Sequence, residues 1–357
     1  MRREAGIAVA LVCICLLIGG FNQDFWSSAN LLNSARQISM LGIYSIGMAF
    51  VVITGGIDLS VGSIVGLTGV IIATLITRSG EPPVVAVAVA VAISVTIGLS
   101  QGLLITRLNL QPFIVTLAGM LLLRGVSQTI CNGGTISLGA SPFRDLADSG
   151  FIEVHGEYLL SYPVLIFMVT IGLGGYLLHY TVFGRYAYAI GGNREAALYS
   201  GVSVKQVELG TYVISAALAG VAGVVYAAYI GQMSHTVGTA YELVAIAAVV
   251  LGGCSLRGGE GSILGVVIGS ALMKVIENGI NLFKIDYHDS SGVLHEWRLN
   301  TNWQYIVIGG VILLAVILDQ TRQLRAQKIR RGKSSSSPEV ARPTPDHTDA
   351  AIAKSRP

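Results

Sequence analysis

The sequence predicts an all-α, polytopic membrane protein. The first observation is composition: 52% of the 357 residues are hydrophobic and 12% are charged, whereas soluble domains carry about 25% charged residues. The second is that most charges fall at the ends of apolar runs. The third is the length of these runs, which fits the roughly 20 residues that a helix needs to cross a bilayer. These observations exclude a large soluble domain.

Apolar runs divide the chain into about ten expected transmembrane helices, which form one membrane domain over residues 1–320. The eighth run is short, so we expect it to be broken or to cross only part of the bilayer. Residues 1–20 also have the basic start and apolar stretch of a signal peptide, but no A-x-A-like cleavage site follows. The predicted spans are 5–20, 31–54, 60–77, 83–106, 112–131, 162–181, 208–230, 241–252, 262–284 and 303–319.

The distribution of basic residues predicts which loops face the cytoplasm. With the N-terminus inside, the inner loops and the tail hold most of the Lys and Arg residues, while the outer loops hold Arg78, Arg144 and Arg298. The positive-inside rule therefore places both termini in the cytoplasm. Residues 321–357 are rich in Ser, Pro and charge, which predicts a disordered basic tail. The formal net charge of +3 does not indicate nucleic acid binding.

A polar stretch at residues 182–207 is predicted to form a cytoplasmic loop with a short helix. Asn193 is a suitable N-cap, Glu195 suits the positive end of the helix dipole, and Gly201 suits a left-handed C-terminal stop. A helix of about two turns is not stable alone in water, so another part of the protein or a partner must hold it. Ser203 and Gln206 have the spacing of a capping box for the next span.

Two glycine-rich stretches resemble each other, ITGGIDLSVGSIVGLTG at 53–69 and LGGCSLRGGEGSILG at 251–265. Paired glycines let the backbone leave a helix, which a membrane protein tolerates only where the freed polar groups are buried or face water. Asp58 has two interpretations, either a pathway or gating carboxylate, or a helix cap or a charge at the cytoplasmic surface. The candidate residues of a translocation path or gate are Gly55, Gly56, Asp58, Ser60, Gly252 and Gly253.

Other polar and small residues within the spans have structural interpretations. Lys274 and Glu277 are three residues apart and can pair on one helix face, and Arg124 is expected to reach the outer membrane interface. The small residues Ala216, Ala219, Gly220 and Gly223 predict close helix packing in the seventh span. No cluster suits catalysis or metal binding, so any energy for transport must come from a partner.

The stretch GRYAYAIGGNREAALYSGV at 184–202 resembles the coupling-helix segment of permease subunits of bacterial ABC importers for simple sugars, the ribose, xylose, arabinose and galactose group. Both glycine-rich stretches resemble the same family, with Cys254 where the family usually has Thr. The resemblance implies a fold with internally repeated helices. It also implies that the ATPase-coupling helix comprises Asn193, Arg194, Glu195, Ala196, Ala197, Leu198 and Gly201.

The resemblance further implies the partners. Two permease copies form the channel in the bacterial inner membrane, ABC ATPase subunits use ATP and Mg²⁺ at the cytoplasmic side, and a periplasmic sugar-binding protein delivers the solute. The permease itself then binds no cofactor. Three alternatives remain at this point: a permease for branched-chain amino acids, a secondary transporter with coupling carboxylates at mid-membrane, and an integral membrane enzyme.

Overall fold

The structure is a computed structural model. It describes residues 2–288 apart from 152, 155, 156 and 159, then residues 294–298 and isolated positions between 303 and 321. The chain divides into two units, Met1–Ala315 and Val316–Pro357, and every helix and strand named below belongs to the first. The predicted tail lies almost entirely outside the described residues, so its separation from the membrane domain stays a prediction.

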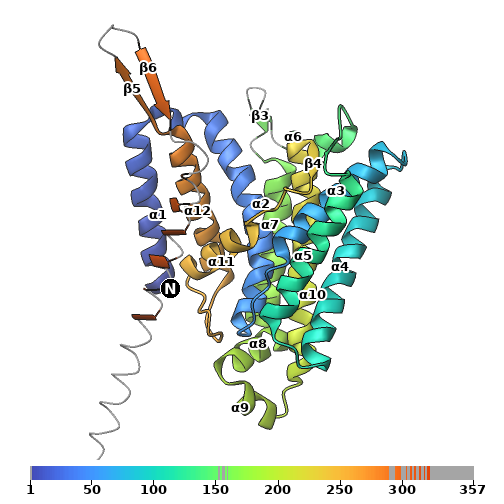
Figure 1. Ribbon diagram of the computed structural model, residues 1–357. Helices are drawn as coiled ribbons and strands as arrows, with labels where there is room; N and C mark the ends of the chain where they lie inside the picture. The colour runs from blue at the N-terminus through green and yellow to red at the C-terminus, as the bar shows by residue number, and fades with distance from the viewer. Residues whose placement is uncertain are drawn as a thin grey trace, which may run out of the picture. The chain divides into compact units, whose positions relative to one another are not determined.

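Seven helices of the described residues are long and apolar enough to cross a membrane, and two apolar helices are shorter. These nine helices follow nine of the ten predicted spans in order, which confirms the all-α membrane class (Figure 1). The tenth run, 303–319, is described only at isolated positions. The long helices are α1 (Arg2–Phe21), α2 (Ser28–Ile53), α4 (Pro83–Arg107), α5 (Pro112–Cys131), α7 (Tyr162–Tyr180), α10 (Val204–Ile230) and α12 (Ile263–Leu282), and the shorter ones are α3 (Val61–Thr77) and α11 (Tyr241–Leu251).

Short elements occupy the connections. Strand β1 (Thr135–Ser137) pairs in antiparallel fashion with β4 (Gln232–Ser234), which joins the loop after α5 to the end of α10. The long connection after α12 forms a hairpin in which Lys284 lies opposite Arg298. The remaining short elements are η1 (Gln23–Trp26), η2 (Pro142–Arg144), α6 (Asp145–Asp148), α8 (Val182–Gly192), α9 (Arg194–Tyr199), β2 (Glu153–Val154), β3 (Glu157–Tyr158), β5 (Lys284–His288) and β6 (Leu294–Arg298).

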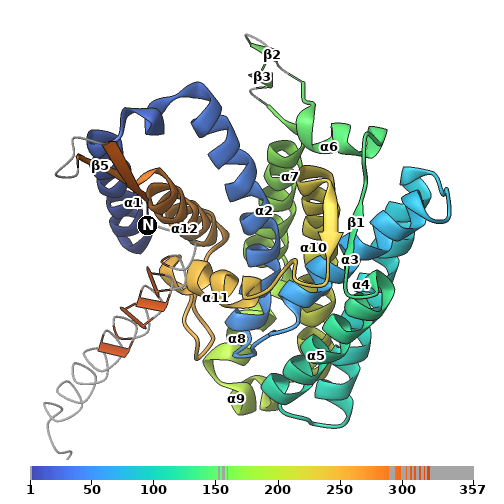
Figure 2. The ribbon, with the colours of Figure 1, turned by 45° about the horizontal axis from the view of Figure 1, so that its top comes forward.

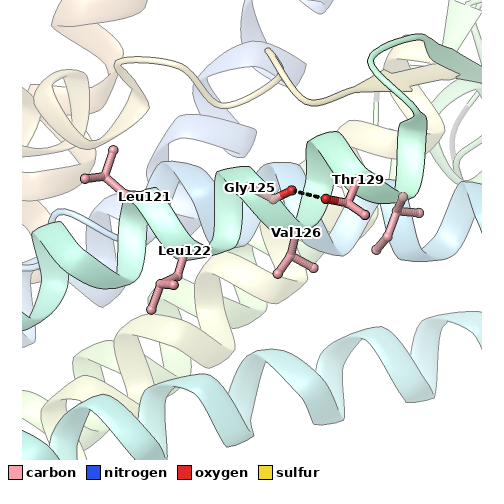
Figure 3. A pocket seen from close by; sticks show the side chains of 6 residues that line it. Leu121, Leu122, Gly125, Val126 and Thr129 are labelled. Atoms are coloured by element: carbon pink, nitrogen blue, oxygen red, sulfur yellow. Dashed lines mark hydrogen bonds between the residues drawn. The ribbon is translucent and has the colours of Figure 1, made fainter.

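Helix α2 forms the centre of the core, where every residue from Ser39 to Ile53 is buried. In its most apolar window 83% of the residues are buried, against 6% in α1 and 17% in α5. The apolar side chains that α1 and α5 expose suit the hydrocarbon of a bilayer. On α5 they form a shallow groove of about 530 Å³ along one side of the helix, lined by Leu121, Leu122, Gly125, Val126, Thr129 and Ile130 (Figure 3).

Close contacts at glycines pack α10 against its neighbours. A Cβ atom on Gly220 would lie 2.7 Å from the side chain of Ser94 on α4, and one on Gly223 would lie 2.7 Å from Thr68 on α3. From α4, Gly98 approaches the backbone of Tyr212 and Val213 on α10 in the same way. The hydroxyls of Thr68 and Ser94 lie 2.9 Å apart beside this contact. The small-residue packing predicted for this span is therefore confirmed.

We predict that Gly98→Leu destabilises the membrane domain, because the added side chain meets the backbone of α10 and overpacking costs about 1–3 kcal/mol. Thermal unfolding of the detergent-purified protein, followed by size-exclusion chromatography, measures the effect. Gly175→Leu on α7 is the matched control, since a Cβ there has no neighbour within 4 Å. An equal loss in both variants would contradict the packing argument.

Candidate coupling and gating site

The α8–α9 segment is built by local capping. The Thr181 side chain accepts a hydrogen bond from the Gly184 N–H at the start of α8, and Asn193 Oδ1 accepts from the Ala196 N–H at 2.9 Å at the start of α9. Gly201 ends the turn after α9 with φ of +82°, a conformation that favours glycine. The predicted cap and stop are confirmed, and the six-residue α9 is slightly shorter than the two turns expected.

The capping box predicted at the start of the seventh span is wrong. Ser203 is the N-cap residue of α10, but its side chain makes no capping hydrogen bond. Its backbone carbonyl instead accepts from the Gln206 and Val207 N–H groups at 3.0 and 3.2 Å. Because the turn before it already ends at Gly201, α10 begins four residues earlier than the predicted span at 208.

Helix α9 faces outward except at one residue. Ala197 is 5% exposed, whereas Leu198 is 55% and Tyr199 is 87% exposed. In both ribbon views α8 and α9 lie at the same end of the membrane domain as the turn between α4 and α5 (Figures 1 and 2). Leu198 and Tyr199 therefore present apolar surface at this end of the membrane domain.

A charged pair joins α9 to α10. Arg194 Nε donates to Glu208 Oε1 at 2.8 Å and its Nη2 donates to Glu208 Oε2 at 3.2 Å, a two-point geometry that arginine forms with carboxylates. This hydrogen bonding raises the pKa of the Arg194 guanidinium. The Arg194 side chain is 54% exposed, so the pair contributes at most about 1 kcal/mol. Its effect is mainly to fix the direction of α9.

Helix α8 contacts both glycine-rich stretches. The Gly259 N–H donates to the Ile53 carbonyl at 2.8 Å, which joins the loop after α11 to the end of α2. Gly191 packs on this hydrogen bond, and a Cβ there would collide with the Ile53 oxygen and the Gly259 nitrogen. Three backbone segments meet here, and glycine is required for so close an approach.

Tyr188 adds a side-chain link between α8 and the same loop. Its hydroxyl donates to the Gly261 carbonyl at 2.7 Å. Burial raises the pKa of Tyr188 to about 12, and a tyrosine hydroxyl is already protonated at neutral pH at its usual pKa of about 10. The coupling segment therefore has two separate contacts with the loop between α11 and α12.

The glycine pairs Gly55–Gly56 and Gly252–Gly253 end α2 and α11 with the same backbone geometry. The structural correspondence is shifted by one residue from the alignment of the two glycine-rich stretches. Gly55 has φ of +83° and Gly253 has φ of +90°, each two residues after its helix. The next N–H bonds back to the helix at 2.9 Å from Gly56 to Val51 and 3.1 Å from Cys254 to Val249. This is the pattern of a Schellman stop, so Gly253 corresponds to Gly55 rather than to Gly56.

The structure brings only part of the predicted gate together. A Cβ on Gly258 would lie 2.8 Å from the Gly55 nitrogen, so the later part of the second stretch meets the first. Gly252 instead packs against Gly265 on α12, where a Cβ would lie 2.5 Å from its carbonyl. The second stretch therefore divides between two contacts, one with α12 and one with the α2–α3 turn.

Asp58 lies inside the protein, with 1% exposure. Its Oδ1 accepts from the Ser60 N–H at 2.9 Å and from Ser60 Oγ at 2.6 Å, and its Oδ2 accepts from Ser215 Oγ at 2.7 Å. Ser215 is the twelfth residue of α10, about 16 Å along that helix from its start. The reading of Asp58 as a charge at the cytoplasmic surface is therefore wrong.

The turn around Asp58 also connects to α4 and α5. Ser60 Oγ lies 3.0 Å from Gln101 Oε1 on α4, and Thr116 Oγ1 on α5 donates to the Ile57 carbonyl at 3.3 Å. Buried polar groups are costly unless they are hydrogen-bonded. The network satisfies Asp58 and ties the turn to three helices, which makes it suitable for transmitting movement from α10 to α3.

The other charged residues predicted within the spans also have partners inside the protein. Lys274 Nζ lies 2.6 Å from Glu277 Oε2, so the predicted pair is confirmed. Arg124 is hydrogen-bonded within the protein, and its expected position at the outer interface stays a prediction. It donates to the Gly238 carbonyl at 3.0 Å and to Thr239 Oγ1 at 2.9 Å, because the connection before α11 offers acceptors beside the middle of α5.

Several residues of the site were not singled out from the sequence. They act through packing or hydrogen bonds, and most lie far from their partners in the chain. For Gly258 and Gly259 the sequence holds a signal that was not used, since the density of glycine in RGGEG, residues 257–261, is typical of a close backbone contact. The additional residues are Tyr188, Gly191, Glu208, Ser215, Gly258 and Gly259.

Comparison with known proteins identifies similar chains. Ribose import permease protein RbsC of Escherichia coli strain K12 is 37% identical over 315 residues, covering 88% of this chain and 93% of that protein. L-arabinose ABC transporter permease protein AraH of Azospirillum brasilense is 33% identical over 328 residues, 91% of each chain. Xylose transport system permease protein XylH of Haemophilus influenzae is 32% identical over 376 residues, 89% of this chain and 96% of that protein.

These matches confirm the resemblance predicted from the sequence. No solved structure matches the chain. The model of one protein family matches residues 30–316, which run from the third residue of α2 to beyond the end of α12. The chain therefore belongs to the family described as branched-chain amino acid transport system / permease component.

Proposed function

We propose that this chain is the membrane-spanning subunit of an ATP-driven ABC importer for a simple, ribose-like sugar. The observation that carries the proposal is the similarity to ribose, arabinose and xylose permeases over about nine-tenths of the chain. The family description names branched-chain amino acids, so such a permease is the second candidate. The individual relatives are named as permeases for ribose, arabinose and xylose, and the similarity covers at least 91% of each of them. They therefore favour a sugar as the solute.

The proposed assembly follows from the same family. Two copies of the permease form the translocation path, and ABC ATPase subunits bind ATP and Mg²⁺ and hydrolyse ATP, so the permease needs no catalytic site or cofactor of its own. A periplasmic binding protein delivers the sugar. We place the chain in the bacterial inner membrane with both termini in the cytoplasm, which puts the α8–α9 segment on the side of the ATPases.

The α8–α9 segment is the proposed contact with the ATPase. Its exposed Leu198 and Tyr199 offer apolar surface, while Ala197 anchors the helix on the protein. Movement of α9 reaches the membrane domain by two routes. One passes through Gly191 to the α2 end and the α11–α12 loop, and the other passes through Glu208 and α10 to the buried Asp58 network. These routes suit alternating access driven from the cytoplasm.

Reconstitution tests the proposed function. We expect proteoliposomes that contain the permease, its ATPase subunits and the sugar-binding protein to accumulate radiolabelled D-ribose, D-xylose or L-arabinose only when ATP is present on the ATPase side. L-leucine is the solute that tests the second candidate. Uptake of any of these solutes by the permease alone would contradict an ATP-driven subunit, and ATP-dependent uptake of L-leucine but no sugar would support the second candidate.

We predict that Ala197→Leu and Gly201→Val uncouple ATP hydrolysis from transport. Ala197 is buried beneath α9 and Gly201 has a left-handed conformation that valine rarely adopts, so both changes displace the docking surface. Sugar uptake should fall at least about tenfold, a coupling loss near 1.4 kcal/mol, while the permease still inserts. Ala10→Leu on the exposed α1 adds the same bulk and is the control. Normal uptake by both coupling variants would count against this role.

We predict that Ser215→Ala impairs transport and stability, because it removes a donor from the buried Asp58 carboxylate. A hydrogen bond to a charged group contributes about 1.5–3 kcal/mol. Ser45→Ala on α2 is the control, since the Ser45 hydroxyl is buried with no hydrogen-bond partner among the described residues. Thermal unfolding and ATP-dependent uptake should both fall for Ser215→Ala only. Equal behaviour of the two variants would show that the Asp58 network has no special role.

A further inference from the structure

The connection between α10 and α11 is non-helical and lies along one side of α3. It contains β4 and the turns up to Ala240. On α3, side chains at Gly62, Gly66 and Gly69 would collide with the Gly238 carbonyl, the Val237 carbonyl and the Met233 side chain. These glycines are four and three residues apart, so they form one face of the helix. Their lack of side chains lets the connection lie directly on α3.

Arg124 on α5 also bonds to this connection. Its Nη2 donates to the Gly238 carbonyl at 3.0 Å, and its Nη1 donates to Thr239 Oγ1 at 2.9 Å. Its charge is balanced by Glu242, whose Oε2 lies 3.7 Å from Nη2. Within the described residues this Oε2 is buried without a hydrogen bond. The Arg124 side chain keeps 22% exposure, so part of the guanidinium is accessible.

Hydroxyl groups continue the accessible surface beside Arg124. Thr236 and Thr239 are exposed. The Ser234 and Thr236 hydroxyls lie 2.8 Å apart, and Thr239 Oγ1 donates to the Thr236 carbonyl at 2.7 Å. A guanidinium has five N–H donors and a hydroxyl can both donate and accept. The surface therefore offers more hydrogen-bonding capacity than its own residues use.

Within the bilayer this surface must face protein, water or a polar solute rather than lipid. Helix α11 has 11 residues and spans only about 16 Å, so the connection and α11 together must cross the bilayer of roughly 30 Å. Charged side chains and irregular backbone at such depth are tolerated where they face protein or a water-filled path. Arg124 also lies on a different side of α5 from the apolar groove in Figure 3, by the 3.6-residue helical period.

We propose that Arg124, Thr236 and Thr239 form a binding site for an uncharged, hydroxyl-rich solute on the translocation path. This inference rests on the function proposed above and adds the residues that contact the sugar. Glu242 neutralises Arg124, so the site does not favour an anion. The solute hydroxyls bond to the guanidinium and the two threonine hydroxyls, while Glu242 keeps Arg124 in position.

The test removes one hydroxyl from the protein and one from the solute. The probe is whichever of D-ribose, D-xylose and L-arabinose the wild-type complex imports, together with its monodeoxy analogues. Each is supplied at a concentration that saturates the binding protein, and maximal uptake is measured in proteoliposomes of the full complex. Thr239→Val and Thr236→Val keep the side-chain shape but remove the hydroxyl. Thr96→Val on α4 is the control, because its exposed hydroxyl bonds only within its own helix at 2.8 Å.

We expect Thr239→Val or Thr236→Val to lower maximal uptake of the complete sugar about three- to tenfold, the usual effect of one lost hydrogen bond. For at least one deoxy analogue the same substitution should have little further effect, since the partner hydroxyl is already absent. A purely structural role would lower uptake of every analogue by the same factor, which would overturn the proposal.

Arg124→Lys is a second variant, and it is expected to alter the preference among analogues because lysine lacks the planar donor arrangement. If this variant fails to assemble, the threonine variants still decide the question. Wild-type-like uptake and preference in both threonine variants would overturn the site but leave the transport function intact. If the wild-type complex imports no sugar with ATP, the proposed function fails and the site fails with it.

Discussion

The hydrogen bond from Gly259 to the Ile53 carbonyl, with Gly191 packed upon it, is the contact on which the proposed coupling role of the α8–α9 segment depends. It joins three segments that lie far apart in the sequence. Backbone atoms make the contact, so it is stiffer than one between long side chains. Any side chain at Gly191 would separate α8 from the two segments below it. The position of the coupling segment is therefore fixed by the ends of α2 and α11.

The second constraint is the burial of Asp58. A carboxylate away from water is costly unless its lone pairs are hydrogen-bonded, and Ser60 and Ser215 supply these bonds. The turn between α2 and α3 must therefore stay close to α10. Because α10 begins directly after the α8–α9 segment, the proposed mechanism carries a shift of its first turns to the start of α3 through this network. In that proposal the candidate gating residues and the candidate coupling residues belong to one connected structure.

The sequence predicted the membrane class and nine of the spans because a run of about 20 apolar residues matches the thickness of a bilayer when it is helical. The caps at Asn193 and Gly201 could also be predicted from the sequence, because such contacts involve neighbours in the chain. The capping box predicted at Ser203 was wrong, because the prediction used only its spacing to Gln206 and did not consider the turn that already ends at Gly201. Long-range contacts were beyond reach, because no local pattern marks Ser215 as a partner of Asp58, or Gly238 and Thr239 as partners of Arg124.

Rigidity of the contact between the coupling segment and the glycine loops is the central claim. Spin labels at the exposed residues Arg185 on α8 and Glu260 in the loop after α11 measure this contact in the reconstituted complex, with and without ATP. A rigid contact predicts that the distance between these labels stays constant within about 2 Å, the scale of side-chain motion, while sugar is transported. A change of several ångströms in an active complex would contradict it, because α8 would then move independently of the loops.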